Sequence, residues 1–472
     1  MLSLLIYNYI IFFFLVFFLL NVYYRFNTTF LSSTGQVNTL FYLTLAAVVY
    51  IAASLMFISY DIYLSTLFTA KGLFLLSGKF LSLFYFPFIY IFLLVTVVSL
   101  LFCLNYNMSE LFSFLVYIAI IFLSGLGLFY SDSIILFFVF YEFLLVPSFI
   151  ILYRYSKTRR SVEAAFLMFF WTQFGAIFLI FAFFYIFLVT SSTSFSTLAL
   201  FNFTPFEVNF IFLFFLVGFG VKLPIWPFYD WLPKAHVEAS TNFSIFLSGV
   251  LVKFAFFGFL KCLLLLESEP NFIFIFPYLL IGIVDSVLKV FHQIDIKKLV
   301  AFCTVVEMHW LLICVVSGQS YLWLSGFAML ISHAIISTNS FLMVDAIARR
   351  FKTRLVTEIS GLNFLCPKLF LLTLANCIVF LGFPGSLFFI AEFLFFSFLI
   401  DAFPLLALIL AFLLYIILAI FFLRLWMNIL FSSISHYKNS VVQDVDKSEF
   451  LIFSFFLVLV FWLGNTWQTF IF

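Results

Sequence analysis

Long apolar runs separated by short polar breaks dominate the hydropathy pattern of the chain. Each run is long enough to cross a lipid bilayer as a helix, which takes about 20 apolar residues. The pattern predicts about 14 spans and no inserted soluble domain, since every connecting loop is short. The predicted spans are residues 2–20, 40–60, 83–104, 111–129, 133–153, 162–189, 208–228, 242–265, 272–291, 298–317, 320–346, 369–397, 403–430 and 449–467.

Composition supports an integral membrane protein and excludes several other classes. The chain is 66% hydrophobic and 9% charged, whereas a soluble domain has about 25% charged residues. No basic block or low-complexity tail indicates nucleic-acid binding. The six cysteines are scattered without a CxxC pair, so we expect no metal site, Fe–S site or disulfide framework. We therefore expect one integral membrane domain over residues 1–472, surrounded by lipid.

Basic residues gather in alternate loops between the predicted spans. Only Lys71, Lys79 and Lys261 fall in the opposite loops. By the positive-inside rule, the basic loops face the cytoplasm or matrix, and both termini face the other side. The basic loops carry Arg25, Arg154, Lys157, Arg159, Arg160, Lys234, Lys297, Lys298, Arg349, Arg350, Lys352, Arg354, Lys438 and Lys447.

A row of ionisable side chains interrupts the apolar spans. A charge at the bilayer centre costs several kcal/mol, so such groups usually face the bundle interior and mark ion paths. Burial disfavours the charged form of lysine and glutamate alike, which helps both to exchange protons. The row favours a proton relay, and the alternative is an inert Glu–Lys pair that orients helices. Its members are Glu142, Lys222, Lys253, Glu307 with His309, His333 and Glu392.

Prolines adjoin two members of this row. Pro224 and Pro227 follow Lys222, and Pro384 precedes Glu392 in the run GFPG. Proline breaks a helix, and broken helices at membrane depth recur in transporters at the substrate site, although an ordinary kink is the alternative. The two interrupted spans are five apart, as are the spans of Glu142 and Glu307. This spacing indicates two related five-helix units, inverted because five is odd.

Three further polar groups allow two interpretations each. Asp285 and Lys289 form an i,i+4 pair that serves either as an interfacial ion pair or as part of the relay. His236, in the segment WLPKAHVEA, either orders its loop or accepts a proton.

At these residues the chain resembles a known family. The segment Val221–Lys261, VKLPIWPFYDWLPKAHVEASTNFSIFLSGVLVKFAFFGFLK, is similar to the signature of the chain 4 family of antiporter-like subunits of proton-pumping NADH–ubiquinone oxidoreductase, respiratory complex I. The segment Gln293–Phe302, the span with His333, and GFPG followed by Glu392 fit the same family. The resemblance extends from about residue 133 to 392. Outside it, the chain matches only as hydrophobic helices.

The resemblance implies an all-α polytopic fold of about 14 transmembrane helices with helices 7 and 12 broken. N-terminal helices over 1–110 would precede inverted five-helix repeats over 111–265 and 272–430, and a C-terminal helix would lie within 431–472. Glu142 and Lys222 match the family's ion pair between helices 5 and 7, Lys253 its central lysine, and Glu392 its helix 12 acid. His236 and His333 match family histidines.

The chain departs from the family pattern at helix 10 and near the first break. The family usually has histidine at Tyr229 and proline at Ser240. It has a Ser-His pair where this chain has Val306 and Glu307, and His309 lies two residues further on. Glu307 and His309 are therefore both candidates for the polar path through helix 10.

The resemblance also implies surroundings and a route. Protons would enter from the matrix side through helices 7 and 8, reach Lys253, and pass through His333 to Glu392, with the Glu142–Lys222 pair as a gate. This chain would bind no metal or cofactor, and NADH, FMN, Fe–S clusters and ubiquinone would belong to the parent complex. Chains 2 and 5 and the redox arm would be its partners.

The 81 phenylalanines are typical of an AT-rich organelle genome, which agrees with the mitochondrial inner membrane. Two other functions share the buried charges. One is a subunit of a cation/proton antiporter without a redox arm, and the other is a purely structural membrane scaffold.

Overall fold

The computed structural model describes residue 95 and residues 108–155, 158–266, 275–317, 320–432 and 443–466. The chain divides into two compact units, and the larger comprises Val116–Asn465. Every tertiary contact discussed below lies within this larger unit. The predicted spans 2–20, 40–60 and 83–104 lie outside the described residues, apart from residue 95.

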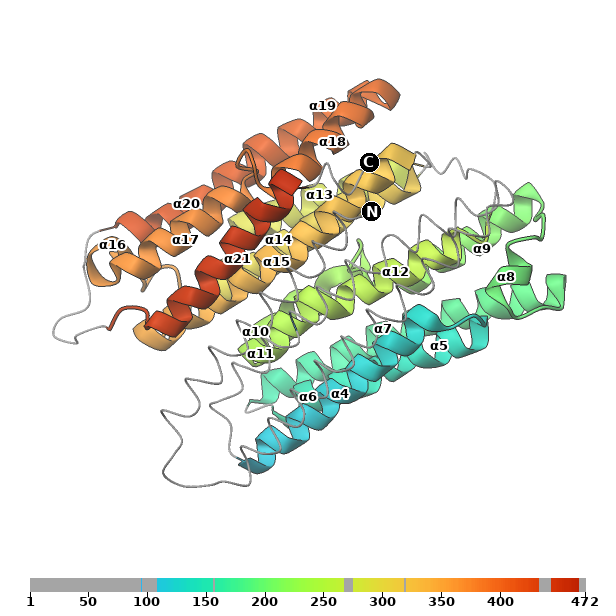
Figure 1. Ribbon diagram of the computed structural model, residues 1–472, viewed down its shortest axis with the longest axis horizontal. Coiled ribbons are helices and arrows are strands. Elements are labelled where there is room, and N and C mark those ends of the chain that lie inside the picture. The colour runs from blue at the N-terminus through green and yellow to red at the C-terminus, as the bar shows by residue number, and fades with distance from the viewer. Residues whose placement is uncertain are drawn as a thin grey trace. The chain divides into compact units, whose positions relative to one another are not determined.

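Helices make up nearly all the regular structure of the described residues (Figure 1). Eight helical stretches in this part of the chain are long and apolar enough to cross a membrane. The prediction of a polytopic helical membrane protein is therefore confirmed. The main helices are α4 Met108–Tyr130, α5 Ile134–Phe143, α6 Leu145–Arg154, α7 Arg159–Thr190, α8 Phe195–Leu198, α9 Pro205–Lys222, α10 Trp231–Glu238, α11 Thr241–Phe246, α12 Val252–Leu263, α13 Phe276–Phe291, α14 Ile296–Val316, α15 Ser320–Phe351, α16 Leu362–Leu365, α17 Pro367–Phe380, α18 Leu387–Ala402, α19 Pro404–Ala411, α20 Ala419–Phe431 and α21 Lys447–Thr466.

The helix that carries Lys253 lies between two groups of helices. Its α12 part packs against α9, and its α11 part packs against α15. The helices α14 and α15 pack along each other and are buried over their whole apolar length, whereas α7 keeps much of its surface exposed. Phe170 and Leu188 of α7 are examples of large apolar side chains on this outer surface. The most buried helices of the unit are therefore those that carry Lys253, Glu307 and His333.

Both proline-containing segments that the sequence marks as breaks end a helix. In the predicted span 208–228, α9 ends at Lys222, and α10 begins only at Trp231, beyond the end of that span. In the predicted span 369–397, α17 ends at Phe380 and α18 begins at Leu387. Proline removes a backbone donor and so ends a helix, and the bounds of the two spans are corrected: the first helix is shorter than predicted, and the second span consists of two helices.

Glycines shape the second break. Gly382 and Gly385 have φ angles of 77° and 89°, a left-handed region that favours glycine. Gly464 of α21 lies directly against the backbone of Gly385, so that a Cβ on Gly464 would overlap the Gly385 carbonyl oxygen. The final helix therefore packs against the break itself.

Two π-helical segments, which the sequence does not predict, interrupt other spans. One is η3, Leu247–Leu251, between α11 and α12, and the other is η5, Phe412–Leu418, between α19 and α20. In η3 the Val252 N–H bonds to the Leu247 carbonyl, five residues back, instead of to that of Ser248. Such segments often mark functional sites.

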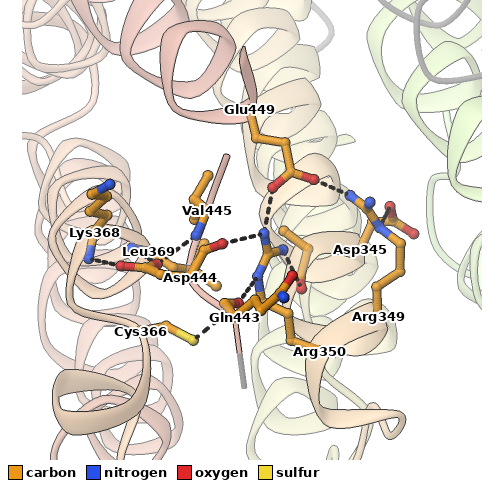
Figure 2. Close-up of polar contacts among 11 residues, drawn as sticks. Asp345, Arg349, Arg350, Cys366, Lys368, Leu369, Gln443, Asp444, Val445 and Glu449 are labelled. Carbon is orange, nitrogen blue, oxygen red and sulfur yellow. Dashed lines mark hydrogen bonds and ion pairs between the residues drawn. The ribbon is translucent and has the colours of Figure 1, made fainter. Parts of the chain in front are cut away.

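A cluster of ion pairs joins α15 to the start of α21 (Figure 2). Arg349 Nη2 lies 2.9 Å from Glu449 Oε1, and Arg350 Nη2 lies 2.5 Å from Glu449 Oε2. Arg349 Nε also pairs with Asp345 at 2.8 Å. The Glu449 side chain is only 9% exposed, so both of its oxygens are committed to arginine within a largely buried site.

The segment that precedes α21 is fixed by the same cluster. The Asp444 carboxylate accepts hydrogen bonds from the backbone N–H of Lys368 and Leu369, at 2.9 and 3.3 Å, in the first turn of α17. Arg350 Nε donates to the Gln443 carbonyl at 3.0 Å, as Figure 2 shows. A carboxylate at a helix N-terminus is favourable, because it satisfies N–H groups without an intrahelical partner.

Replacing Glu449 with alanine leaves the mostly buried Arg350 and the more exposed Arg349 without their shared carboxylate. We expect the free energy of unfolding to fall by about 2 kcal/mol, between the values for exposed and buried pairs. The thermal unfolding midpoint of the detergent-solubilised protein would measure this. The control is Glu163→Ala, which breaks the exposed Arg159–Glu163 pair. Equal midpoints for the two variants would contradict the assigned role of the cluster.

Candidate functional site

The predicted pair of Glu142 and Lys222 is present, with 3.6 Å between Glu142 Oε1 and Lys222 Nζ. Lys222 Nζ also donates to the Tyr141 carbonyl at 3.1 Å and lies 3.3 Å from the centroid of the Tyr141 ring. Gln173 of α7 donates from Nε2 to Glu142 Oε2 at 2.8 Å. The pair is thus a network of three helices, α5, α7 and α9.

The local sequence explains where this network forms. Glu142 lies at the end of α5, and Pro147 has no N–H to offer the Phe143 carbonyl four residues earlier, so the helix is interrupted between α5 and α6. Lys222 is the last residue of α9, at the first break. A cavity lined by Tyr141, Lys222 and Leu251, among others, extends from the pair to η3.

The central feature of the site is a buried row of Lys253, His333 and Glu307. Lys253 Nζ lies 2.6 Å from His333 Nδ1, and His333 Nε2 lies 3.0 Å from Glu307 Oε2. The second contact is at hydrogen-bonding distance but lacks the alignment of a regular hydrogen bond. The three residues are each at most 4% exposed. They come from α12, α15 and α14, so tertiary packing alone brings them together.

The π-helical segment η3 supplies a further partner for Lys253. Because the Val252 N–H bonds to the Leu247 carbonyl, the Ser248 carbonyl does not accept from Val252 and accepts a hydrogen bond from Lys253 Nζ. The Ser248 hydroxyl donates to Ser337 Oγ of α15 at 2.8 Å. The lysine is therefore held by its own helix on one side and by His333 on the other.

This row can move one proton without building up net charge. An ammonium on Lys253 can donate to His333 Nδ1 while the His333 Nε2 proton passes to Glu307, which leaves neutral lysine, neutral imidazole and a protonated carboxyl. The opposite shift restores the ion pair. In a site shielded from water, such an exchange between charged and neutral forms is far cheaper than creating a single isolated charge.

Glu392 occupies the second break. Its Oε2 accepts a hydrogen bond from the Tyr415 hydroxyl at 3.0 Å, and Tyr415 belongs to η5. The same oxygen lies so close to Gly382 that a Cβ there would overlap it. The carboxyl is 8% exposed. It therefore lies between a π-helical segment and a left-handed glycine, which leaves little room for a larger residue at position 382.

His236 is fully buried in α10, where its ring stacks on Phe341 at 4.7 Å between centroids. Lys253 and Lys297 are the cations that act on it electrostatically. Both ring nitrogens of the buried His236 imidazole are without a hydrogen-bond partner among the described residues.

A second polar cluster lies beside the first break. Lys289 Nζ is 3.1 Å from Asp285 Oδ2 and 3.4 Å from Asp230 Oδ1, and it donates to the Tyr229 hydroxyl. Tyr229 in turn donates to Asp285. The Asp285–Lys289 pair is more than an i,i+4 contact, because it joins α13 to the segment before α10. His309 lies near this cluster, and its polar contacts in the described part of the chain are with Trp226 and Val305 and not with Lys253, His333 or Glu307.

Every ionisable side chain of the predicted row is thus buried or mostly buried, but the row separates into distinct groups. Glu307, and not His309, contacts His333. The sequence analysis missed Gln173, Ser248 and Tyr415 as partners. Tyr415 and Gln173 had a weak signal as lone polar groups in apolar spans, whereas nothing in the pattern marks the π-helical segments. Among the described residues, no three His, Cys, Asp or Glu side chains gather in a way that would hold a metal ion.

Comparison with known proteins identifies the family of the chain. Residues 131–422 match the family described as NADH:quinone oxidoreductase/Mrp antiporter, TM. The chain belongs to this family. It is 37% identical over 341 residues to NADH-ubiquinone oxidoreductase chain 4 of Paramecium tetraurelia, which covers 72% of each chain. It is 33% identical over 345 residues to chain 4 of Arabidopsis thaliana, which covers 70% of this chain and 68% of the relative.

Solved structures share the fold of this chain. Respiratory complex I from Thermus thermophilus contains a chain that superposes with a TM-score of 0.71 at 22% identity, over 81% of each chain. The Mrp complex from Dietzia sp. contains one with a TM-score of 0.70 at 18% identity, also over 81% of each. Helices that pack in this way therefore occur both in a respiratory complex I and in an Mrp complex.

Replacing Gly382 with alanine places a methyl group where the Glu392 carboxylate lies, at a backbone angle that disfavours alanine. We expect a loss of about 1 kcal/mol of stability from the backbone and, in addition, displacement of Glu392. Infrared difference spectroscopy of the carboxyl C=O stretch, assigned with Glu392→Gln, would show the shift. The control is Gly326→Ala, whose Cβ meets Cys314 at 3.2 Å. An unshifted carboxyl band in Gly382→Ala would contradict the close packing.

Proposed function

We propose that this chain is a core membrane-arm subunit of respiratory complex I that carries protons across the membrane through its buried Lys, His and Glu side chains. The row of Lys253, His333 and Glu307 is the observation that carries the proposal. Relatives named NADH-ubiquinone oxidoreductase chain 4 and NADH-quinone oxidoreductase subunit M support it. NADH oxidation and ubiquinone reduction would then occur in other subunits, which hold the FMN, Fe–S clusters and quinone.

The first stage of the proposed route brings a proton to Lys253. His236, with both ring nitrogens available, and the buried Lys297 lie on the approach from the basic loops. Lys297 Nζ donates to the Ala239 carbonyl at 2.7 Å, just beyond α10. The Glu142–Lys222 pair acts as the gate for this stage. When the two side chains attract each other more strongly, less of the positive charge of Lys222 acts in the cavity that leads toward η3.

The second stage passes the proton through His333 to Glu307 and onward to Glu392. Trp310, three residues after Glu307, packs on Phe388 and Phe395, which flank Glu392 on one face of α18. This packing places the Glu307 face of α14 toward the Glu392 face of α18. Glu392 and its partner Tyr415 are the last described members of the route.

The wider architecture of the proposal follows the same resemblance. It has about 14 helices with inverted five-helix repeats, in which the breaks after Lys222 and before Glu392 occupy equivalent places. The complex would lie in the mitochondrial inner membrane, with the basic loops on the matrix side and both termini opposite. Chains 2 and 5 would be its neighbours, and lipid would cover the exposed face of α7.

The alternative is a subunit of a cation/proton antiporter that works without a redox arm, which the likeness to the Mrp complex favours. Purification of the native complex separates the two. Co-purification with flavin and Fe–S subunits supports the proposal, whereas an isolated complex of antiporter-like chains would overturn it. A structural scaffold is the third possibility, and the lysine variant below addresses it.

Replacing Lys253 with methionine roughly keeps the length of the side chain and removes the amine that binds the proton. We expect NADH-driven proton translocation in reconstituted vesicles to fall roughly 100-fold while the complex still assembles, since a proton-transfer group typically contributes at least that factor. The matched control is Lys234→Met at an exposed position, which should pump normally. Normal pumping by the assembled Lys253→Met complex would support the scaffold and defeat the mechanism.

Replacing Glu307 with glutamine tests the helix 10 stage alone. Glutamine keeps an acceptor for His333 Nε2 but cannot take up the proton, so we expect pumping to fall by at least roughly tenfold. The infrared band of the protonated carboxyl should also disappear. The control is Glu163→Gln on the outer surface. Full pumping by Glu307→Gln would mean that the route passes from His333 to Glu392 without this residue.

A further inference from the structure

The break after α9 leaves backbone groups that need partners. Pro224 and Pro227 have no N–H, and the Ile225 N–H reaches five residues back to the Gly220 carbonyl at 2.9 Å. Trp226 lies between the two prolines, and its N–H has no helical acceptor. An unpaired N–H at this depth costs about 1–3 kcal/mol. A side chain from another helix has to supply the acceptor.

His309 of α14 supplies that acceptor. Trp226 N–H donates to His309 Nε2 at 2.8 Å. The other ring nitrogen, Nδ1, lies 2.8 Å from the Val305 carbonyl, one turn earlier in α14. A backbone N–H can only donate and a carbonyl can only accept, so Nε2 must be unprotonated and Nδ1 must carry the hydrogen. Both hydrogen bonds can coexist only with the neutral ring.

The ring is also enclosed. His309 is fully buried, and Gly282 of α13 lies so close that a Cβ there would overlap Nε2. The Tyr229 ring lies 6.2 Å away, between centroids. Asp285, the carboxylate that acts on His309 electrostatically, is already paired with Lys289 and Tyr229. The imidazole is therefore closely packed, and the carboxylate that acts on it among the described residues is already paired.

We propose that His309 is a positioning residue, an uncharged clamp that fixes the first break, and that it does not carry protons. It joins the helix of Glu307, two residues earlier, to the segment four residues after Lys222. The orientation of Lys222 toward Glu142 would then depend on a contact with α14. The inference rests on the proposed function for its effect on pumping, whereas its claim about the state of the ring stands on the hydrogen bonds alone.

The first test compares two substitutions at position 309 in the assembled complex. His309→Gln keeps an acceptor for the Trp226 N–H and cannot relay protons, so at least half of the proton translocation should remain. His309→Leu removes the acceptor, and translocation should fall at least fivefold. A proton-carrying histidine would instead lose translocation in both variants. If the leucine variant does not assemble, the glutamine variant decides alone, and its inactivity would overturn the proposal.

The second test changes Gly282, the residue of α13 that lies against the His309 ring. Gly282→Ala should displace the imidazole and lower translocation in the native background, but it should have little further effect in His309→Leu, because contacting residues act non-additively. Gly326→Ala is the control, since its Cβ meets only Cys314, at 3.2 Å. Additive losses from Gly282→Ala and His309→Leu would overturn the clamp.

The third measurement does not depend on pumping. The chain has five histidines, so a ¹⁵N-histidine spectrum from which that of His309→Gln is subtracted isolates one ring. The clamp requires a neutral ring with hydrogen on Nδ1 throughout pH 6–9. An imidazolium signal within that range would overturn the proposal even if the chain pumps protons. Conversely, normal pumping by Lys253→Met would remove the proposed function and leave this assignment intact.

Discussion

The cost of placing charged and polar groups in an apolar interior governs the arrangement of this protein. Lys253 is 4% exposed and lies among apolar side chains of α12. An isolated ammonium there would be prohibitively unfavourable, so it survives only with close partners. His333, Glu307 and the Ser248 carbonyl meet that need. The same requirement that makes the lysine tolerable also connects it to a chain of exchangeable protons.

Irregular backbone supplies many of these partners. The π-helical segment η3 directs a carbonyl to Lys253, and η5 carries the tyrosine that contacts Glu392. The first break presents an N–H to His309. In a bilayer every backbone group must be satisfied, so each local departure from the α-helix has to be matched by a side chain from elsewhere. Irregular backbone segments and buried polar side chains therefore occur together, because each supplies the hydrogen-bond partner that the other needs.

The sequence predicts the members of the site better than their contacts. A lysine or glutamate inside an apolar run is conspicuous, so the whole row was identified by position, and prolines located both breaks. Spacing alone cannot decide which residue of helix 10, here α14, contacts His333. Glu307 and His309 are two residues apart and point about 200° apart around the helix, so only one of them can face His333. Only the packing of α13, α14 and the first break separates them. The π-helical segments leave no periodic signal.

The contact between Gly464 and Gly385 has a mechanical consequence. Ion pairs of Glu449 hold the first turn of α21 to α15, and near its other end the helix presses on the backbone of the second break. Helix α21 thus packs against the break near one of its ends, and ion pairs fix its other end to α15. This packing opposes a hinge-like opening of the break. On the proposed route, a proton would then pass Glu392 by rotation of side chains, and each step would be limited to the length of one carboxyl side chain.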